Sequence, residues 1–268
     1  MAFEWISFTT DYGLEDGFVA ACHGVAARLA PAVRIIDVTH LVQPGDVRRG
    51  ATVLSQTVAD LPRAVHVAVV DPGVGTSRRP VGLLTAAWSI LVGPDNGLLV
   101  PAADQLGGIT AAVALTNAGW HAARVAPTFH GRDVFMPVAA RLAGGADLAD
   151  AGPALDPASL VRLDPLELRR SGDKLFSGVL SVDRFGNVQL AARGDALVPS
   201  MRLVPPVLSV GGRRARLVET FGDVAAGELA VLVDSAGHLA IVVSGGSAAD
   251  RLGVAAGATV EVAPAATE

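Results

Sequence analysis

Three residues in two short stretches have side chains that could together activate a water molecule. Asp71 follows an apolar run, Arg78 comes seven positions later, and His130 lies in a second stretch, Phe129–Phe135. A carboxylate and a neutral imidazole can accept a proton, and a guanidinium keeps its positive charge. We therefore treat these residues as one candidate catalytic set that orients water and stabilises hydroxide character.

The elements expected around this set place it at a sheet edge. Val65–Val70 is apolar and β-branched, which predicts a buried parallel strand, and Pro72-Gly73 ends it with Asp71 at its carboxyl tip. Ligands of open α/β sheets bind at that edge. His130 stands just before a predicted helix, whose N-terminal dipole disfavours a protonated ring. Simpler interpretations are a turn aspartate, a solvated arginine and a loop histidine.

The segments before Asp71 alternate between strand and helix patterns. We expect, in order, a strand at Glu4–Phe8, a helix from Asp16 to Leu29, a strand at Val33–Val38 and a helix capped by Asp46. This alternation predicts a Rossmann-like α/β domain with a mostly parallel sheet. Asp11, at the tip of the first strand, could bind ribose hydroxyls or serve as a turn residue. A dinucleotide fingerprint is excluded, because Arg78 stands where its third glycine would be.

The sequence pattern changes twice after the first domain. We assign residues 1–150 to an N-terminal catalytic domain, 151–171 to a linker with Gly-Pro and Asp-Pro pairs, and 172–268 to a smaller C-terminal domain. In the last of these, short alternating strands are separated by Gly and Asp turns. This pattern predicts an all-β, barrel-like domain.

The composition excludes several classes of protein. The 268 residues are 51% hydrophobic with a mean hydropathy of +0.45, yet no apolar stretch reaches the ~18–20 residues of a membrane-spanning helix. We find no signal peptide and expect a cytoplasmic protein without a membrane partner. The net charge of −5 argues against nucleic acid as a partner. Cys22 is expected in the core, and the scattered histidines predict no metal site.

Five motifs occur in order along the chain. They are T-D-Y-G at Thr10–Gly13, V-D-P-G-V-G-T-S-R at Val70–Arg78, P-D-N-G-L at Pro94–Leu98, F-H-G-R-D at Phe129–Asp133 and D-R-F-G-N at Asp183–Asn187. The ordered set resembles the S-adenosyl-L-methionine hydroxide adenosyltransferase family of adenosine-forming hydrolases, which are relatives of fluorinating and chlorinating enzymes. The resemblance extends from about Trp5 to Val262, nearly the whole chain.

The resemblance implies an activity, an assembly and a set of site residues. Water would cleave S-adenosyl-L-methionine (SAM) to adenosine and L-methionine without a cofactor. A homotrimer would hold SAM between the N-terminal domain of one subunit and the C-terminal domain of its neighbour. The residues implied are Asp71, Arg78 and His130 for catalysis, Asp11 for ribose, Asp183 and Ser235 for the methionine end, and Asn187 with the backbone of Val243 and Gly245 for adenine.

The chemistry of this reaction suggests a role for each catalytic residue. Our hypothesis is that His130 accepts the proton of the attacking water. Asp71 would orient the imidazole or hold the water directly. Arg78 would supply positive potential beside the developing hydroxide.

Departures from the related enzymes bear on the nucleophile. The halide-using relatives lack the Asp-Pro-Gly-Val-Gly-Thr stretch and the histidine at His130, and the fluorinating branch has an insertion where Thr85–Ile90 is short here. Both differences favour water. Ala236 replaces an arginine that grips the methionine carboxylate, and Ser244 replaces a common asparagine. A SAM-dependent halogenase is the alternative enzyme, and a non-catalytic SAM- or adenosine-binding module is the alternative of another class.

Overall fold

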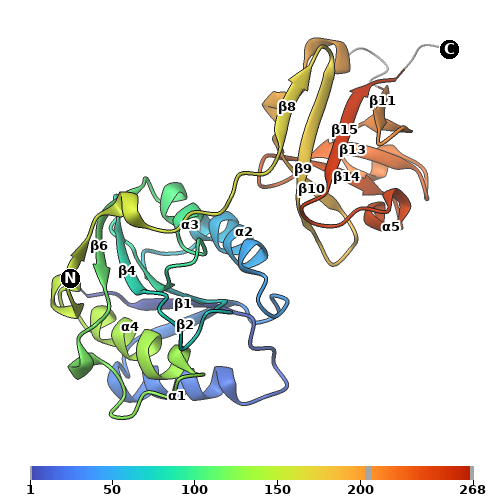
Figure 1. The fold of residues 1–268 in the computed structure, drawn as a ribbon. Coiled ribbons are helices and arrows are strands. Elements are labelled where there is room, and N and C mark those ends of the chain that lie inside the picture. The colour runs from blue at the N-terminus through green and yellow to red at the C-terminus, as the bar shows by residue number, and fades with distance from the viewer. Residues whose placement is uncertain (1, 203–206, 266–268) are drawn as a thin grey trace. The chain divides into compact units, whose positions relative to one another are not determined.

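The computed structural model describes residues 2–202 and 207–265 (Figure 1). The chain divides into two compact units, Met1–Leu163 and Asp164–Glu268. Both ends of the segment expected as a linker are strands: β7 (Ala154–Leu155) pairs within the first unit, and β8 (Leu168–Ser171) pairs within the second.

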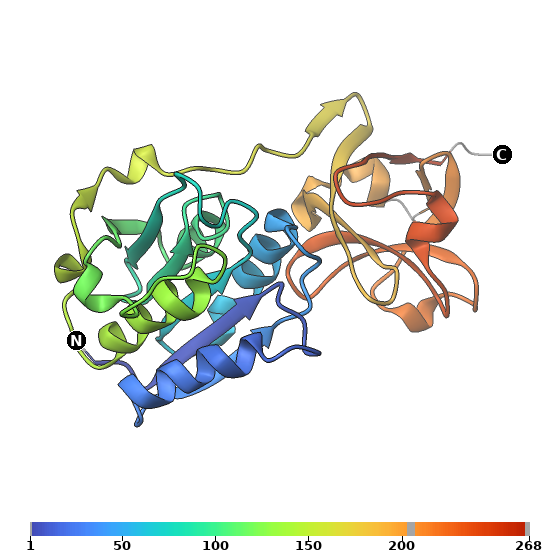
Figure 2. The same ribbon diagram turned by 60° about the horizontal axis from the view of Figure 1, so that its bottom comes forward.

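The N-terminal unit is a sheet between two helical layers (Figures 1 and 2). Its strand order is β2-β1-β3-β5-β4-β6-β7. The strands besides β7 are β1 (Trp5–Thr10), β2 (Arg34–Thr39), β3 (Val65–Val69), β4 (Pro80–Thr85), β5 (Ile90–Pro94) and β6 (Ile109–Ala114). The helix α1 (Phe18–Leu29) packs beside α4 (Met136–Ala143) on one face, and α2 (Val47–Thr57) packs beside α3 (Val100–Gln105) on the other.

The expected mostly parallel sheet is correct for only part of this unit. β2, β1, β3 and β5 are parallel, as the strand–helix alternation predicts. β4 pairs antiparallel with both β5 and β6, and β7 pairs antiparallel with β6. The cause is the short turn at 86–89 between β4 and β5, because a tight hairpin can join only antiparallel strands. The sheet is therefore mixed.

The register of the parallel strands brings three loop starts to one edge. Thr10 of β1 lies opposite Val69 of β3, and Thr9 lies opposite Thr39 of β2. Asp11, His40 and Asp71 follow these positions, so they leave the sheet at its carboxyl edge, where ligands of such sheets bind.

The core follows the predicted apolar pattern. Cys22 is fully buried in the layer of α1 and α4, as expected, and packs in the same cluster as Phe8 of β1. Asp46 caps α2 by accepting a hydrogen bond from the backbone N–H of Arg49 at 2.9 Å. None of the described helices is long and apolar enough to cross a membrane.

The C-terminal unit is a closed β-barrel, as the short alternating strands predict. In the described residues the barrel order is β10-β14-β13-β12-β11-β15-β9, and β9 closes it by pairing with β10, while β8 extends β9. Its strands are β9 (Lys174–Val182), β10 (Val188–Arg193), β11 (Val207–Val210), β12 (Arg213–Leu217), β13 (Leu229–Val233), β14 (His238–Val243) and β15 (Thr259–Pro264). One short helix, α5 (Ala248–Leu252), follows β14.

Candidate active site

Asp71 and Arg78 form an ion pair in the loop after β3. Nε of Arg78 donates to both carboxylate oxygens of Asp71 at 2.9 Å, and Nη2 also contacts Oδ2. The two side chains are only 4% and 10% exposed, so water screens the pair weakly. The loop turns back through Thr76, whose hydroxyl donates to the carbonyl of Gly73 at 2.7 Å. The seven residues from Asp71 to Arg78 therefore form a loop that folds back and places the Arg78 guanidinium at the end of β3.

Arg78 also contacts His130, which lies far away in the sequence. Nη2 of Arg78 is 2.9 Å from Nδ1 of His130. A guanidinium has no acceptor, so Nδ1 accepts this hydrogen bond and a neutral ring must hold its proton on Nε2. Burial lowers the pKa of His130 below 6.5, and the charge of Arg78 lowers it further, against the opposing effect of Asp71. The structure thus places a neutral imidazole, with an N–H donor, beside the ion pair.

His130 begins a π-helical turn, Gly131–Phe135, that runs into α4. Asp133 anchors this turn by accepting from the backbone N–H of Ala126 at 2.8 Å and from Nε of Arg132 at 2.6 Å. Burial opposes ionisation of Asp133, but the hydrogen bonds from Arg132 and Ala126 outweigh it and lower the pKa of the carboxyl. The charged Asp133 therefore fixes the segment that presents His130.

A cavity of about 330 Å³ lies at this edge of the N-terminal unit. Asp11, Asp71 and His130 line it together, so the structure brings three of the predicted residues to one space. Oδ2 of Asp11 accepts from the backbone N–H of Gly45 at 2.8 Å, which leaves Oδ1 for another donor. The carboxylates and the imidazole could hold a polar ligand such as a ribose and a water molecule.

The sequence analysis did not predict a role for two further residues of the cavity, Tyr12 and Gly131. Tyr12 lines it, and burial raises the pKa of the phenol, so Tyr12 stays protonated. Gly131 lies against this ring: a Cβ on Gly131 would come within 2.0 Å of the Tyr12 hydroxyl oxygen. Both residues belong to motifs noted in the sequence, and this close contact explains why a glycine follows His130.

Residues of the P-D-N-G-L motif hydrogen-bond to the backbone at the end of β3. Nδ2 of Asn96 donates to the carbonyl of Val70 at 2.9 Å. Asp95 is paired with Arg79 and accepts from the backbone N–H of Val161 at 2.8 Å. These contacts are structural, and they hold the backbone from which Asp71 extends.

The predicted residues of the C-terminal unit lie in turns of the barrel. Asp183 uses its carboxylate within its own turn: Oδ1 accepts from the backbone N–H of Phe185 and of Asn187, and Oδ2 accepts from the Asn187 amide at 2.8 Å. The turn packs against Ser247, close to Gly245. Ser235 lies in the turn before β14, whereas Gly245 follows that strand, so these two residues lie at opposite ends of β14.

A second hollow, of about 690 Å³, occurs in the C-terminal unit. Its lining consists of Arg216 and Leu217 at the end of β12, with Leu197, Val218, Glu219, Asp223 and Val233. Among the described residues that line it, none is a predicted site residue and none is a proton acceptor paired with a buried cation. The smaller cavity is the better candidate active site.

Comparison with known families gives a match in each unit of the chain. The model of the SAM hydroxide adenosyltransferase N-terminal domain matches residues 6–152, and that of the C-terminal domain matches residues 177–261. The chain belongs to this family. Relatives include a Salinispora tropica protein named (R)-S-adenosyl-L-methionine hydrolase, 62% identical over 96% of this chain and 97% of its own. A Thermus thermophilus protein of the same name is 39% identical over 96% of this chain and 98% of its own.

More distant members of the family extend the comparison. An Actinoplanes protein named fluorinase is 30% identical over 97% of each chain. The crystal structure of an uncharacterized conserved protein from Thermotoga maritima superposes with a TM-score of 0.87 at 36% identity, covering 96% of this chain and 99% of that one. The SAM hydroxide adenosyltransferase fold therefore extends over both units of the chain.

Proposed function

We propose that this chain hydrolyses (R)-S-adenosyl-L-methionine to adenosine and L-methionine. The observation that supports this most directly is Arg78, which bonds both Asp71 and His130 where these two residues line one cavity with Asp11. The names of the Salinispora and Thermus relatives support the substrate and its sulfonium configuration.

The reaction needs help chiefly at the nucleophile. Water forms a bond to the ribose 5′ carbon while the bond from that carbon to sulfur breaks, and its electron pair leaves with sulfur as a neutral thioether. No general acid is required for this leaving group. Water is a weak nucleophile because it is a very weak acid, so the site must orient it and take one of its protons.

The hydrogen bonds around Arg78 divide the roles among the three residues. Arg78 stands between Asp71 and His130, so the carboxylate does not orient the imidazole directly. With the ring proton on Nε2, His130 donates a hydrogen bond to the developing hydroxide, and Asp71 is the acceptor of its proton. Our first hypothesis was that His130 takes the proton. We replace it because the lone pair on Nδ1 of His130 already accepts the hydrogen bond from Arg78.

The remaining family roles stay predictions. Asp11 would bind the ribose hydroxyls through its free oxygen. Asn187 with the backbone of Val243 and Gly245 would contact adenine, and Asp183 and Ser235 the methionine end. A homotrimer would bring this C-terminal group to the N-terminal cavity of a neighbouring subunit. The cytoplasmic location also stays a prediction.

Product analysis in oxygen-18 water tests the activity. We expect adenosine labelled at the 5′-hydroxyl, formed faster from the (R) epimer of SAM than from the (S) epimer. A 5′-halo-deoxyadenosine formed in excess chloride or fluoride would establish the halogenase alternative instead. Calorimetric binding of SAM without any turnover would establish the non-catalytic module.

A further inference from the structure

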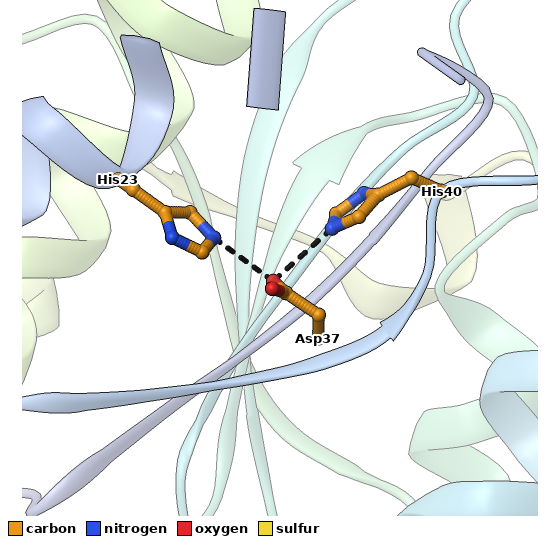
Figure 3. Close-up of side chains that lie close together, drawn as sticks. All are labelled: His23, Asp37 and His40. Carbon is orange, nitrogen blue, oxygen red and sulfur yellow. Dashed lines mark hydrogen bonds and ion pairs between the residues drawn. The ribbon is translucent and has the colours of Figure 1, made fainter. Parts of the chain in front are cut away.

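His23, Asp37 and His40 form a cluster outside the proposed catalytic set (Figure 3). His23 comes from α1, Asp37 from β2 and His40 from the loop after β2. Nε2 of His23 is 2.9 Å and Nε2 of His40 is 3.1 Å from the same oxygen, Oδ1 of Asp37. Both rings thus point at one carboxylate oxygen from different elements.

The contact between Nε2 of His40 and Asp37 does not have the geometry of a hydrogen bond. Its side chain is 2% exposed, and Nε2 is a buried atom without a hydrogen-bond partner among the described residues, although it lies 3.1 Å from Asp37. A buried polar atom in this state costs free energy unless something else satisfies it. A cation placed between the two nitrogens and the carboxylate would do so.

We propose that this cluster binds a divalent transition-metal ion of the zinc class. Two imidazoles and one carboxylate are a common ligand set for such ions, and a water molecule can complete a tetrahedron. Ligand atoms bonded at about 2.0–2.2 Å to a tetrahedral zinc lie about 3.3–3.6 Å apart. The separations of the two nitrogens from Oδ1 of Asp37, 2.9 and 3.1 Å, therefore need to widen only by a few tenths of an ångström. His23 and Asp37 are 35% and 41% exposed, which gives the ion a path from solvent.

The surroundings of His40 fit a metal ligand. A histidine that binds through Nε2 keeps its proton on Nδ1 and donates it to a fixed oxygen. Nδ1 of His40 is 2.8 Å from the hydroxyl oxygen of Thr10, which also accepts from the backbone N–H of Tyr12 at 3.1 Å. The rings of Phe8 and His40 also pack edge to face, with their centroids 4.9 Å apart.

The ion would stabilise the loop that lines the candidate active site. The carbonyl of His40 accepts from the backbone N–H of Gly13 at 2.7 Å, and its ring contacts Thr10. These two bonds enclose Asp11 and Tyr12, both of which line the cavity. The ion's role is therefore structural: it fixes the ends of this loop from outside the cavity.

Zinc titration of tag-free, chelator-treated protein tests the proposal without any assay of turnover. We expect calorimetry to give one Zn²⁺ per chain, and Co²⁺ to give the absorption of a tetrahedral site. Substitution of the half-exposed ligand, His23→Gln, should abolish binding while the circular dichroism spectrum is kept. Thr10→Val, which removes the partner of His40, should weaken binding by about 10–100-fold.

A matched control uses a histidine of the barrel. His238→Ala should retain the stoichiometry and affinity of the wild type. The proposal is overturned if the wild type binds no Zn²⁺ in this titration, or if His23→Gln binds it as tightly as the wild type. Neither result depends on whether the chain hydrolyses SAM.

Discussion

At the scale of single residues, Arg78 is the group that joins two distant parts of the chain. Asp71 and His130 are 59 positions apart in the sequence, and Arg78 hydrogen-bonds to both. The planar guanidinium can bond both residues because its Nε and Nη2 donate to Asp71 while Nη2 also donates to the imidazole of His130. The ring of Phe135 lies 5.1 Å from the guanidinium and supports it from the π-helical turn.

Arg78→Lys should therefore damage catalysis strongly. An ammonium is a point charge and cannot hold both neighbours in this geometry. We expect kcat to fall by ~10²–10³, the usual cost of losing a group that stabilises developing charge. Adenosine release followed by chromatography measures this. Arg34→Lys, whose exposed side chain pairs with Glu4 away from the cavity, is the control and should keep kcat near that of the wild type.

Asp71 and His130 should respond differently to substitution. If Asp71 accepts the proton, Asp71→Asn should lower kcat by ~10²–10⁴. His130→Gln keeps an N–H donor, so its loss of kcat should be clearly smaller. Steady-state kinetics of the two variants decide the assignment. If His130→Gln loses more kcat than Asp71→Asn, the imidazole of His130 and not Asp71 accepts the proton.

Gly131→Ala should disturb Tyr12. The new Cβ would lie 2.0 Å from the Tyr12 hydroxyl oxygen, and that ring forms part of the cavity wall. We expect a loss of about 1–3 kcal/mol in the free energy of unfolding, as for other overpacked sites, together with a higher KM for SAM. The control is Gly24→Ala in α1, where the nearest atom is 3.7 Å away, and a gain of up to ~1 kcal/mol is expected. Denaturant unfolding compares the two variants.

At the scale of elements, β3 both ends at the site and contains a buried titratable group. His66 is fully buried in this strand, and its Nδ1 is 2.7 Å from the hydroxyl of Ser7 in β1. In the part of the chain that the structure describes, its Nε2 has no hydrogen-bond partner. Burial lowers the pKa of His66 to about 4. The folded chain therefore keeps the ring neutral at a pH where the unfolded chain protonates it.

The N-terminal unit should lose stability in mild acid because of His66. The His66 ring takes up a proton near pH 6.5 in the unfolded chain and near pH 4 in the folded chain. Its contribution to the free energy of unfolding is therefore complete above pH 6.5 and is lost as the pH falls toward 4. Between pH 7 and pH 5 we expect His66 to cost about 2 kcal/mol. Urea unfolding at both values tests this. In His66→Gln, which retains a partner for Ser7, the pH dependence should be smaller by that amount.

At the scale of the whole molecule, the question is which chain completes the site. The residues that line the candidate cavity all belong to the N-terminal unit, whereas the expected adenine and methionine contacts lie in the barrel. In the proposed trimer the two parts of each site come from different subunits. A closed ring of three such heterologous contacts forms three equivalent sites.

Co-expression of two inactive variants tests this arrangement. His130→Ala disables the N-terminal part and Asn187→Ala disables the C-terminal part. Random mixing in a trimer leaves about one quarter of the shared sites intact, so activity should recover to about that fraction. Mixing His130→Ala with Asp71→Asn, both in one unit, should restore nothing. If the first pair also restores nothing, the site lies within a single chain.

The sequence by itself determined the local features of this protein. Apolar alternation and punctuation by glycine and proline predicted β3, its end at Asp71 and the barrel-like second unit, because these signals act over a few residues. The ordered motifs indicated the family. The antiparallel half of the N-terminal sheet and the closure of β9 on β10 depend on pairing between distant strands, and no local pattern specified them.

Only the tertiary structure decided how the functional groups meet. It placed Arg78 between Asp71 and His130, so that the imidazole became a donor, and it brought His23 to Asp37 and His40 across fourteen and seventeen positions of sequence. Spacing along the chain cannot reveal such contacts, since α1 must first pack on β2 and the loop that follows it. The residue types were therefore set by the sequence, and their hydrogen-bonding roles were set by packing.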